Sequence, residues 1–421
     1  MNANPALETE TLAEHWSDRP YHRHWLLQRA DDLFDFFEAD IINPKGGFFE
    51  LNLDGTVPGK TNPVRGIHVT CRMIHCFAIA HLLGRPGAMA IVEHGMDFLW
   101  NRHRDTEHGG YFWQVDDNGP VDASKQGYGH AFVLLAASSA RAVGHPLADA
   151  MLADITDVIN TRFWDEAHGA IAEEFERDWS AKDGGNYRGQ NCNMHLTEAL
   201  MAAFEATGDQ AYLSKAERIA DLLIRRKSAE LNWRVPEHFD TGWTVDQAYD
   251  GDQMFRPSGS TPGHWLEWAR LVLQLWTLGG KTHDWMPEAA KGLFFQAMAL
   301  GWDRDNGGFV YTIGWDNIVS RPFKLWWPMA EGAGAAHFLN QHQPSDFHED
   351  SYRRIWGTIS RHFLDRKNGG WHQQLSQTMQ PEAELFPTRD DIYHALQACL
   401  IPLFPADGSV LEMIRTNGDR P

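Results

Sequence analysis

Polar residues that can move protons recur at helical spacing in four stretches of the sequence. The sets are Arg72 with His68, Asn191 with His195 and Glu198, His264 with Glu267, and Asp390 with His394. A spacing of three or four residues places side chains on one face of a helix. Since the remaining positions are largely apolar, the pattern is typical of buried helices that each turn one polar stripe toward a wet cavity.

Two imidazoles near the N-terminal ends of helices suggest base catalysis. The helix dipole disfavours their protonated forms, so they can stay neutral near pH 7 and accept a proton. A base of this kind removes a proton from a carbon beside a carbonyl when a cation or hydrogen-bond donors stabilise the enediolate oxygen. Arg72, Asn191 or a second histidine could do so. This set suits aldose–ketose isomerisation or C2 epimerisation of a sugar, and neither reaction needs a cofactor.

Metal binding is the first alternative for the same residues. His264 and Glu267, together with His195 and His394, could be assembled around a divalent ion. The metal cages of sugar isomerases are richer in carboxylates than this set. We therefore expect no metal and no other cofactor.

Glycoside hydrolysis is the second alternative, because it needs two opposed carboxylates. Glu267, Glu331 and Asp390 could supply them. That interpretation leaves the histidines unexplained, although a single histidine on an apolar helix is more often a hydrogen-bonded core residue than a catalyst.

A loose repeat supplies the elements that would position these residues. Glycine-centred turns followed by short aromatic or β-branched stretches recur, with a degenerate fourth unit, at Gly47, Gly110, Gly169, Pro236, Gly308 and Gly370, in steps of 63, 59, 67, 72 and 62 residues. Each step has room for two helices. The polar positions Arg72, His130, His195, His264, Glu331 and His394 follow their turns by 20 to 28 residues, so we expect them at a similar depth in the fold.

The repeat predicts six antiparallel helix pairs in an all-α fold. The expected helices are 22–38, 67–83, 87–102, 127–143, 146–162, 191–207, 210–227, 261–278, 284–300, 326–340, 346–363 and 390–403, with short β-hairpins in the long loops on one face. The last helix is strongly apolar, which favours a closed ring, the (α/α)6 barrel, over an open superhelix with polar ends. We expect a single catalytic domain over 1–421 with its core at about 20–405, and peripheral segments at 1–18 and after 404.

Composition excludes several classes of partner. The net charge of −20 over 421 residues argues against nucleic acid, anionic membranes and strongly anionic substrates. The 18 tryptophans include Trp113, Trp326 and Trp327, which could stack on sugar rings. The four cysteines lie in apolar helical patterns without a CxxC pair, and no signal peptide or membrane span is evident, so we expect a cytoplasmic protein.

Five segments resemble the N-acylglucosamine 2-epimerase superfamily, most closely its bacterial D-mannose isomerase and sulfoquinovose isomerase branch. They are ASKQGYGHAF (123–132), NCNMHLTEAL (191–200), GSTPGHWLEWARL (259–271), LWWPMAEG (325–332) and DDIYHALQ (390–397). The similarity extends from about residue 20 to 405. The resemblance implies an (α/α)6 barrel and proton transfer by two histidines without metal or cofactor.

Residue roles follow from the matching motifs. His394 would carry a proton between C2 and C1 through a cis-enediolate, and His264 would act in ring opening and in proton relay to the oxygens, held by Glu267. The other expected substrate-binding residues are Arg72, Tyr128, Asn191, His195, Glu267, Trp327, Glu331 and Asp390.

Substrate choice within the superfamily is less constrained by these motifs. Isomerases and epimerases share the histidine pair, and the resemblance is greatest to the isomerases. Met254 and Asp390 stand where the sulfosugar enzymes carry Arg and Gln, so we expect the neutral pair D-mannose and D-fructose, with D-lyxose and D-xylulose as a side activity. The alternatives are a 2-epimerase of the N-acylglucosamine or cellobiose type, a sulfoquinovose isomerase, and a renin-binding-like protein. We expect a monomer or weak homodimer.

Overall fold

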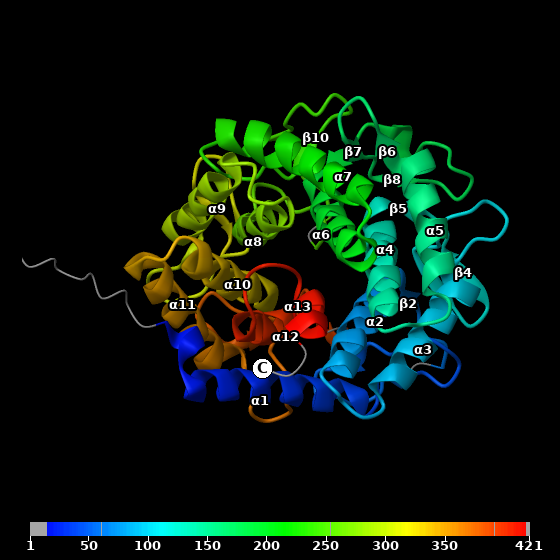
Figure 1. Ribbon diagram of the computed structural model, residues 1–421, viewed down its shortest axis with the longest axis horizontal. Helices are drawn as coiled ribbons and strands as arrows, with labels where there is room; N and C mark the ends of the chain where they lie inside the picture. Colours follow the sequence, from blue (N-terminus) through cyan, green and yellow to red (C-terminus); the bar gives the residue numbers. More distant parts are fainter. Residues whose placement is uncertain (1–14, 60, 253, 391, 418–421) are drawn as a thin grey trace, which may run out of the picture.

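Twelve helices form a closed double ring, seen end-on in Figure 1. The structure is a computed structural model that describes residues 15–59, 61–252, 254–390 and 392–417. The inner ring consists of α2 (Ile67–Leu82), α4 (Gly127–Ala142), α6 (Gln190–Thr207), α8 (Pro262–Leu278), α10 (Trp326–His342) and α12 (Tyr393–Leu400). The outer ring consists of α1 (Pro20–Glu38), α3 (Ala88–Phe98), α5 (Ala148–Val158), α7 (Gln210–Ala220), α9 (Trp285–Gln296) and α11 (Asp346–Thr358). The predicted (α/α)6 barrel is confirmed, and α12 closes it by packing against α1, α2 and α10.

The two rings differ in burial as their sequences predict. Nearly every residue of α2 and α8 is buried, because these helices have neighbours on both sides and turn their inward face to the interior of the barrel. In α7 the buried residues follow a single stripe, Leu213, Ala216, Ile219 and Ala220. An outer helix therefore needs one apolar face, whereas an inner helix is apolar nearly all round.

Five outer helices of the described chain end in a π-helical turn. The turns are Leu99–His103, Ile159–Phe163, Asp221–Ser228, Ala297–Gly301 and Ile359–Phe363. Four of them lead into the glycine turns of the repeat, where Gly110, Gly169, Gly308 and Gly370 have φ between 67° and 76°. Glycine adopts this left-handed conformation without steric penalty, which accounts for its recurrence at this place.

Short strands fill the long loops, and all of them lie between an outer helix and the next inner helix. They are β1 (Leu51–Asn52), β2 (Arg65–Gly66), β3 (Gln114–Asp116), β4 (Gly119–Asp122), β5 (Lys125–Gln126), β6 (Trp164–Asp165), β7 (Ala170–Ile171), β8 (Glu174–Phe175), β9 (Arg188–Gly189), β10 (His238–Phe239), β11 (Thr312–Ile313), β12 (Val319–Arg321), β13 (Lys324–Leu325), β14 (Gln374–Leu375), β15 (Pro381–Glu382) and β16 (Thr388–Arg389). All pairings are antiparallel, and β1 pairs with β16, so the first and last units are joined at this end of the ring as well.

A buried ion pair ties three of the glycine turns to the strand that precedes the next inner helix. The pairs are Asp105 with Lys125 at 2.9 Å, Asp303 with Lys324 at 2.8 Å, and Asp365 with Arg389 at 2.6 Å. Each aspartate also accepts backbone N–H groups of its own turn. Since these cations come shortly before α4, α10 and α12, the ion pairs help to fix where those helices begin.

A thirteenth helix corrects the expectation that the chain after 404 is peripheral. α13 (Val410–Asn417) buries Val410, Leu411 and Ile414, and it packs against α2 and α4 near the centre of the ring (Figure 1). The apolar stripe of α13 is so short that a sequence pattern does not distinguish a packed helix from an unpacked end of the chain. The expectation for residues 1–14 lies outside the described residues.

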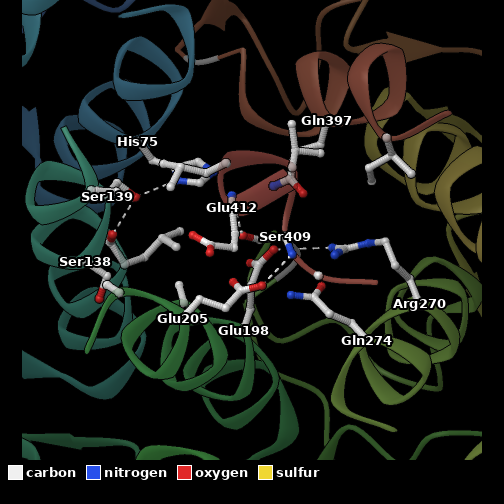
Figure 2. A pocket seen from close by; sticks show the side chains of 18 of the residues that line it. His75, Ser138, Ser139, Glu198, Glu205, Arg270, Gln274, Gln397, Ser409 and Glu412 are labelled. Carbon is white, nitrogen blue, oxygen red and sulfur yellow. Dashed lines mark hydrogen bonds and ion pairs between the residues drawn. The ribbon is translucent and has the colours of Figure 1, made fainter. Parts of the chain in front are cut away.

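A cavity, which we call the second cavity, lies between α13 and the inner helices at the end of the barrel away from the long loops. His75, Glu205, Arg270 and Gln397 line it from four different inner helices, and Ser409 lines it beside α13 (Figure 2). The backbone N–H of Ser409 donates to Oε1 of Glu205 at 2.8 Å. The cavity thus lies under the segment that closes the far end of the barrel, away from the long loops.

Candidate active site

A pocket opens where the inner helices begin, at the end of the barrel that carries the long loops. Its lining residues are His68, Arg72, Tyr128, Asn191, His195, Met254, Phe255, His264, Glu267, Tyr311, Trp326, Trp327, Phe386, Asp390 and His394. Nine of the ten expected site residues are among them. The tenth, Glu331, is buried behind His394.

His394 is oriented by Glu331. Its Nδ1 lies 2.8 Å from Oε1 of Glu331, which comes from the neighbouring helix α10. Burial by itself raises the pKa of the Glu331 carboxyl, but the charge of Arg270 and the hydrogen bond from His394 bring it below its ordinary value. Because an ionised carboxylate can only accept, Nδ1–H donates and Nε2 remains for the pocket.

His264 is oriented by Glu237, not by Glu267 as the family motif implies. Its Nδ1 lies 2.9 Å from Oε2 of Glu237, a residue just before β10. Nε2 of Gln190 donates to the same carboxylate oxygen at 2.8 Å. The expected pair is wrong because His264 reaches outward to the loop before α8, whereas Glu267 faces His195 on α6.

Trp327 lies against both histidines. Its ring centroid is 5.0 Å from that of His264 and 5.9 Å from that of His394, at interplanar angles of 32° and 38°. The three rings form one side of the pocket. An indole in this position offers a flat apolar surface to a sugar ring between two possible proton carriers.

The opposite side of the pocket carries hydrogen-bond donors. An Nη of Arg72 donates to the hydroxyl of Tyr128 at 2.9 Å, and its guanidinium stacks 4.6 Å from the ring centroid of Phe132. The ring of Tyr128 meets that of His195 edge-on at 5.1 Å. Burial lowers the pKa of His195 to about 4, so its imidazole is neutral near pH 7.

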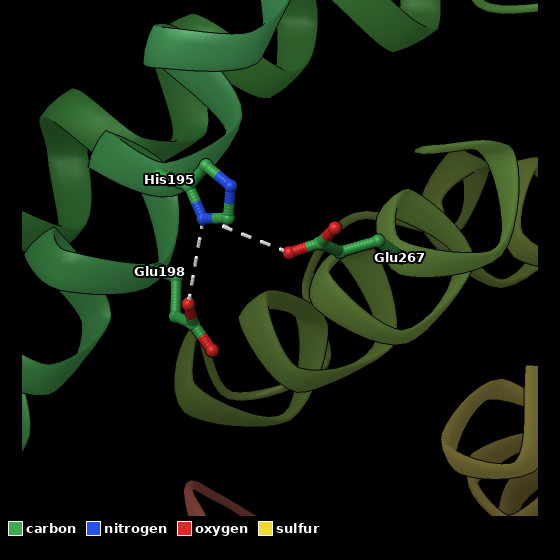
Figure 3. A group of neighbouring side chains, drawn as sticks. All are labelled: His195, Glu198 and Glu267. Carbon is green, nitrogen blue, oxygen red and sulfur yellow. Dashed lines mark ion pairs between the residues drawn. The ribbon is translucent and has the colours of Figure 1, made fainter. Parts of the chain in front are cut away.

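At the floor of the pocket, two of three neighbouring carboxylates pair with one guanidinium. Arg270 lies 3.0 Å from Glu331 and 3.4 Å from Glu198, and Glu198 also accepts from the hydroxyl of Tyr393. The third carboxylate, Glu267, approaches the same atom of His195 as Glu198 does, since Nδ1 of His195 is 3.9 Å from Glu198 and 3.7 Å from Glu267 (Figure 3).

The same residues bear on the metal alternative. Among the described residues, three ligand-type atoms come within 4.8 Å of one another in two overlapping sets: His195, Glu198 and Glu267, and Glu267, Glu331 and His394. Arg270 already pairs with two of these carboxylates, so a metal ion would have to displace it or lie beside its permanent charge. The arrangement favours an ion-pair network, and we assign no metal to it.

Some polar residues have places that the sequence pattern does not anticipate. His130 accepts from the backbone of Tyr111 and contacts the carbonyl of Gln126, so it is a wall residue of the fold rather than part of the pocket. Asp390 lines the pocket but precedes α12, which begins at Tyr393, and it accepts from Nε2 of Gln373 at 3.1 Å.

Sequence reasoning missed Glu237, Gln190, Tyr311 and Phe386. Glu237 follows Pro236, the one place where the glycine turn of the repeat is lost, and this break was the available signal. The hydroxyl of Tyr311 donates to the carbonyl of Met254 at 2.8 Å and so connects the loop before α8 to the loop after α9. No local spacing links residues of this kind, because each belongs to a different loop.

The closed ring and its histidine-lined pocket define an enzyme of the (α/α)6-barrel class. Comparison with known families matches residues 46–398 to the family described as N-acylglucosamine 2-epimerase. A D-mannose isomerase of Thermobifida fusca is 40% identical over 411 residues, 96% of this chain and 99% of that protein. One of Pseudomonas cannabina pv. alisalensis is 40% identical over 93% of this chain and 94% of its own length.

A solved structure supports the same assignment. A crystal structure of a D-mannose isomerase superposes with a TM-score of 0.84 at 32% identity, covering 90% of this chain and 97% of the other. The chain belongs to the N-acylglucosamine 2-epimerase family. Within the described residues, every helix is too short or too polar to cross a membrane.

Proposed function

We propose that the protein is an aldose–ketose isomerase that interconverts D-mannose and D-fructose. The observation that carries the proposal is the pair of imidazoles, His264 and His394, each with Nδ1 within 2.9 Å of a carboxylate and both against Trp327. The choice of substrate rests on the D-mannose isomerases that are 40% identical to this chain. D-Lyxose and D-xylulose, which lack C6, form the proposed side activity.

His394 is the base in this mechanism. Its Nε2 takes the proton from C2 of the open-chain aldose while the electrons of the C–H bond form the enediolate and the C1 carbonyl oxygen becomes negative. The same imidazolium returns the proton to C1, which leaves C2 as the new carbonyl carbon. Glu331 keeps the ring in one orientation and stabilises its charged form.

His264 moves protons between oxygens. It opens the pyranose ring by taking the anomeric hydroxyl proton and returning a proton to the ring oxygen. It then carries the proton of the C2 hydroxyl to the negative O1, so that charge and atoms balance over the cycle. Arg72, Asn191 and His195 provide cationic and neutral donors around the developing enediolate.

The first test is turnover of D-mannose by the intact protein. We expect D-fructose to form, with undiminished rate after treatment with EDTA, and turnover to fall below detection in His264→Ala and in His394→Ala. His81→Ala, which changes an exposed histidine of α2, is the matched control and should behave as wild type. Loss of turnover on EDTA treatment would overturn the metal-free mechanism.

A second test separates isomerisation from epimerisation. Turnover in D2O followed by NMR reports whether deuterium enters C1 of fructose or C2 of an epimer. Parallel incubations with cellobiose, N-acetylglucosamine and sulfoquinovose cover the other activities known on this scaffold. Accumulation of a C2 epimer without ketose would replace the isomerase by a 2-epimerase.

We infer that a sulfosugar is a poor substrate. Asp390 and Met254 both line the pocket, and a carboxylate opposes a sulfonate group. The net charge of −20 acts in the same direction. Faster turnover of sulfoquinovose than of mannose would overturn this preference.

We also propose that the protein works in the cytoplasm. All four cysteines are buried and unpaired, which agrees with a reducing compartment.

A further inference from the structure

Glu267 differs from the other carboxylates at the pocket floor because it lacks a cationic partner at close range. Its side chain is 1% exposed, and its Oε1 has no hydrogen-bond partner among the described residues. The nearest basic atom is Nδ1 of His195 at 3.7 Å, which is too far for a hydrogen bond. Arg270 is turned to Glu198 and Glu331.

Burial and two neighbouring carboxylates oppose the ionisation of Glu267 more strongly than Arg270 and Arg72 favour it. The titratable and charged groups of the neighbouring elements are Arg72 on α2, His195 and Glu198 on α6, His264 and Arg270 on α8, Glu331 on α10, and Tyr393 and His394 on α12. Burial and the charges of Glu331 and Glu198 raise the pKa of Glu267 well above its ordinary value. Burial also tends to raise the pKa of Glu198, but His195 and Arg270 hold it well below its usual range.

We propose that Glu267 is a neutral carboxylic acid in the working enzyme and donates its O–H to the sugar oxygen that becomes negative during proton transfer. The proposal rests on the proposed function, since it assigns a role to Glu267 in the same pocket. No bond to the substrate forms, and the proton stays on Glu267.

The position of Glu267 supports this role. It lines the pocket together with Arg72, Asn191 and His195, the other donors to the enediolate. An ionised carboxylate there would repel the enediolate, whereas a neutral acid in a site shielded from water is a strong donor. A single oxyanion donor of this kind contributes about 10²- to 10³-fold to kcat.

The protonation state can be measured without substrate. The infrared difference spectrum of wild type minus Glu267→Gln near pH 7 should contain the carbonyl band of a protonated carboxylic acid. Glu93→Gln, which changes an exposed glutamate of α3, is the control, and its spectrum should leave the Glu267 band in place. Loss of a carboxylate band in place of the acid band would overturn the proposal, even if the protein does not isomerise mannose.

Kinetics test the donor role. Gln is neutral, has a similar shape and keeps an N–H donor, so Glu267→Gln should lose no more than about tenfold in kcat. Glu267→Leu removes the donor and should lose about 10²- to 10³-fold with a small change in KM. Equal, near-complete loss in both variants would mean that an ionised Glu267 is needed, as a base or a metal ligand.

The pH profile gives an independent readout. In wild type, kcat should fall as pH rises through the pKa of Glu267, because the donor is lost and a negative charge appears. That limb should be missing in Glu267→Gln, whose amide does not titrate. An unchanged limb in Glu267→Gln would assign it to another group and contradict the proposal.

Discussion

Each of the two pocket imidazoles depends on a carboxylate from a different segment of the chain. Glu331 precedes His394 by 63 residues, and Glu237 precedes His264 by 27. A carboxylate at Nδ1 fixes the tautomer, so that Nε2 is left to accept a proton. Each of these histidines therefore acts together with its carboxylate.

Substitution of Glu237 tests whether the carboxylate acts through His264. Glu237→Gln keeps the shape of the side chain but removes the charge that stabilises the imidazolium of His264, so kcat should fall about 10- to 100-fold with little change in KM. Steady-state kinetics on D-mannose measure this. Glu230→Gln, an exposed glutamate before the same loop, is the control. A kcat equal to that of wild type would show that Glu237 does not act through His264.

The candidate site was predictable where its residues share a helix. His264 with Glu267 and Asn191 with His195 are spaced three or four residues apart, so one face of one helix brings both members of each set to the pocket. The partner of His264 was not predictable, because Glu237 lies in a loop whose path depends on its pairing with the segment before α6. Spacing alone also selected His130, which has the right depth but turns its nitrogens to backbone groups.

The glycine turns act as anchors for the inner helices. Lys324 is fully buried and pairs with Asp303 in the turn after α9, two residues before α10 begins. Since α10 carries Trp327 and Glu331, this ion pair connects a glycine turn of the repeat to the helix that brings these two residues to the pocket. The π-helical turns before these anchors were not foreseen, since a helical periodicity does not distinguish one extra residue in the last turn.

Replacing Lys324 should therefore affect both stability and activity. Lys324→Met fills a similar volume but leaves Asp303 without its buried partner, which should lower the free energy of unfolding by about 3 to 5 kcal/mol. Urea denaturation measures the loss, and KM for mannose should rise as Trp327 shifts. Lys367→Met, at an exposed position, should change neither. A stability within error of wild type would mean that the ion pair does not anchor the turn.

At the scale of the whole molecule, the ring was predictable because its pattern is repeated. Six units with the same order of outer helix, turn, strands and inner helix leave few arrangements, and an apolar last helix favours closure. The helix α13 has no counterpart in the repeat. Its burial depends on the far end of a barrel whose existence must first be inferred.

The far end of the barrel should make stability depend on pH. Burial raises the pKa of Glu205 to about 7, so the folded chain retains a proton that the unfolded chain loses near its ordinary value of about 4.5. The contribution to stability is therefore fully present below that value and is lost as pH rises toward 7.

Denaturation of wild type and Glu205→Gln between pH 5 and pH 8 measures this contribution. The difference in unfolding free energy should move in favour of Glu205→Gln as pH rises and then level off above about pH 7. Glu93→Gln, which changes a glutamate exposed on α3, controls for general charge effects. A difference that is constant over this range would show that Glu205 does not hold a proton in the folded protein.

Closure of the ring by α12 has a consequence for biosynthesis. The apolar face of α1 packs mainly on α12, although its Phe34 also meets Phe77 of α2, and α12 also brings His394. A nascent chain on the ribosome thus exposes the part of its first helix that faces α12 until nearly the whole sequence has been translated. It also stays catalytically silent, so an unfinished or prematurely terminated chain should present a hydrophobic surface to chaperones and proteases rather than partial activity.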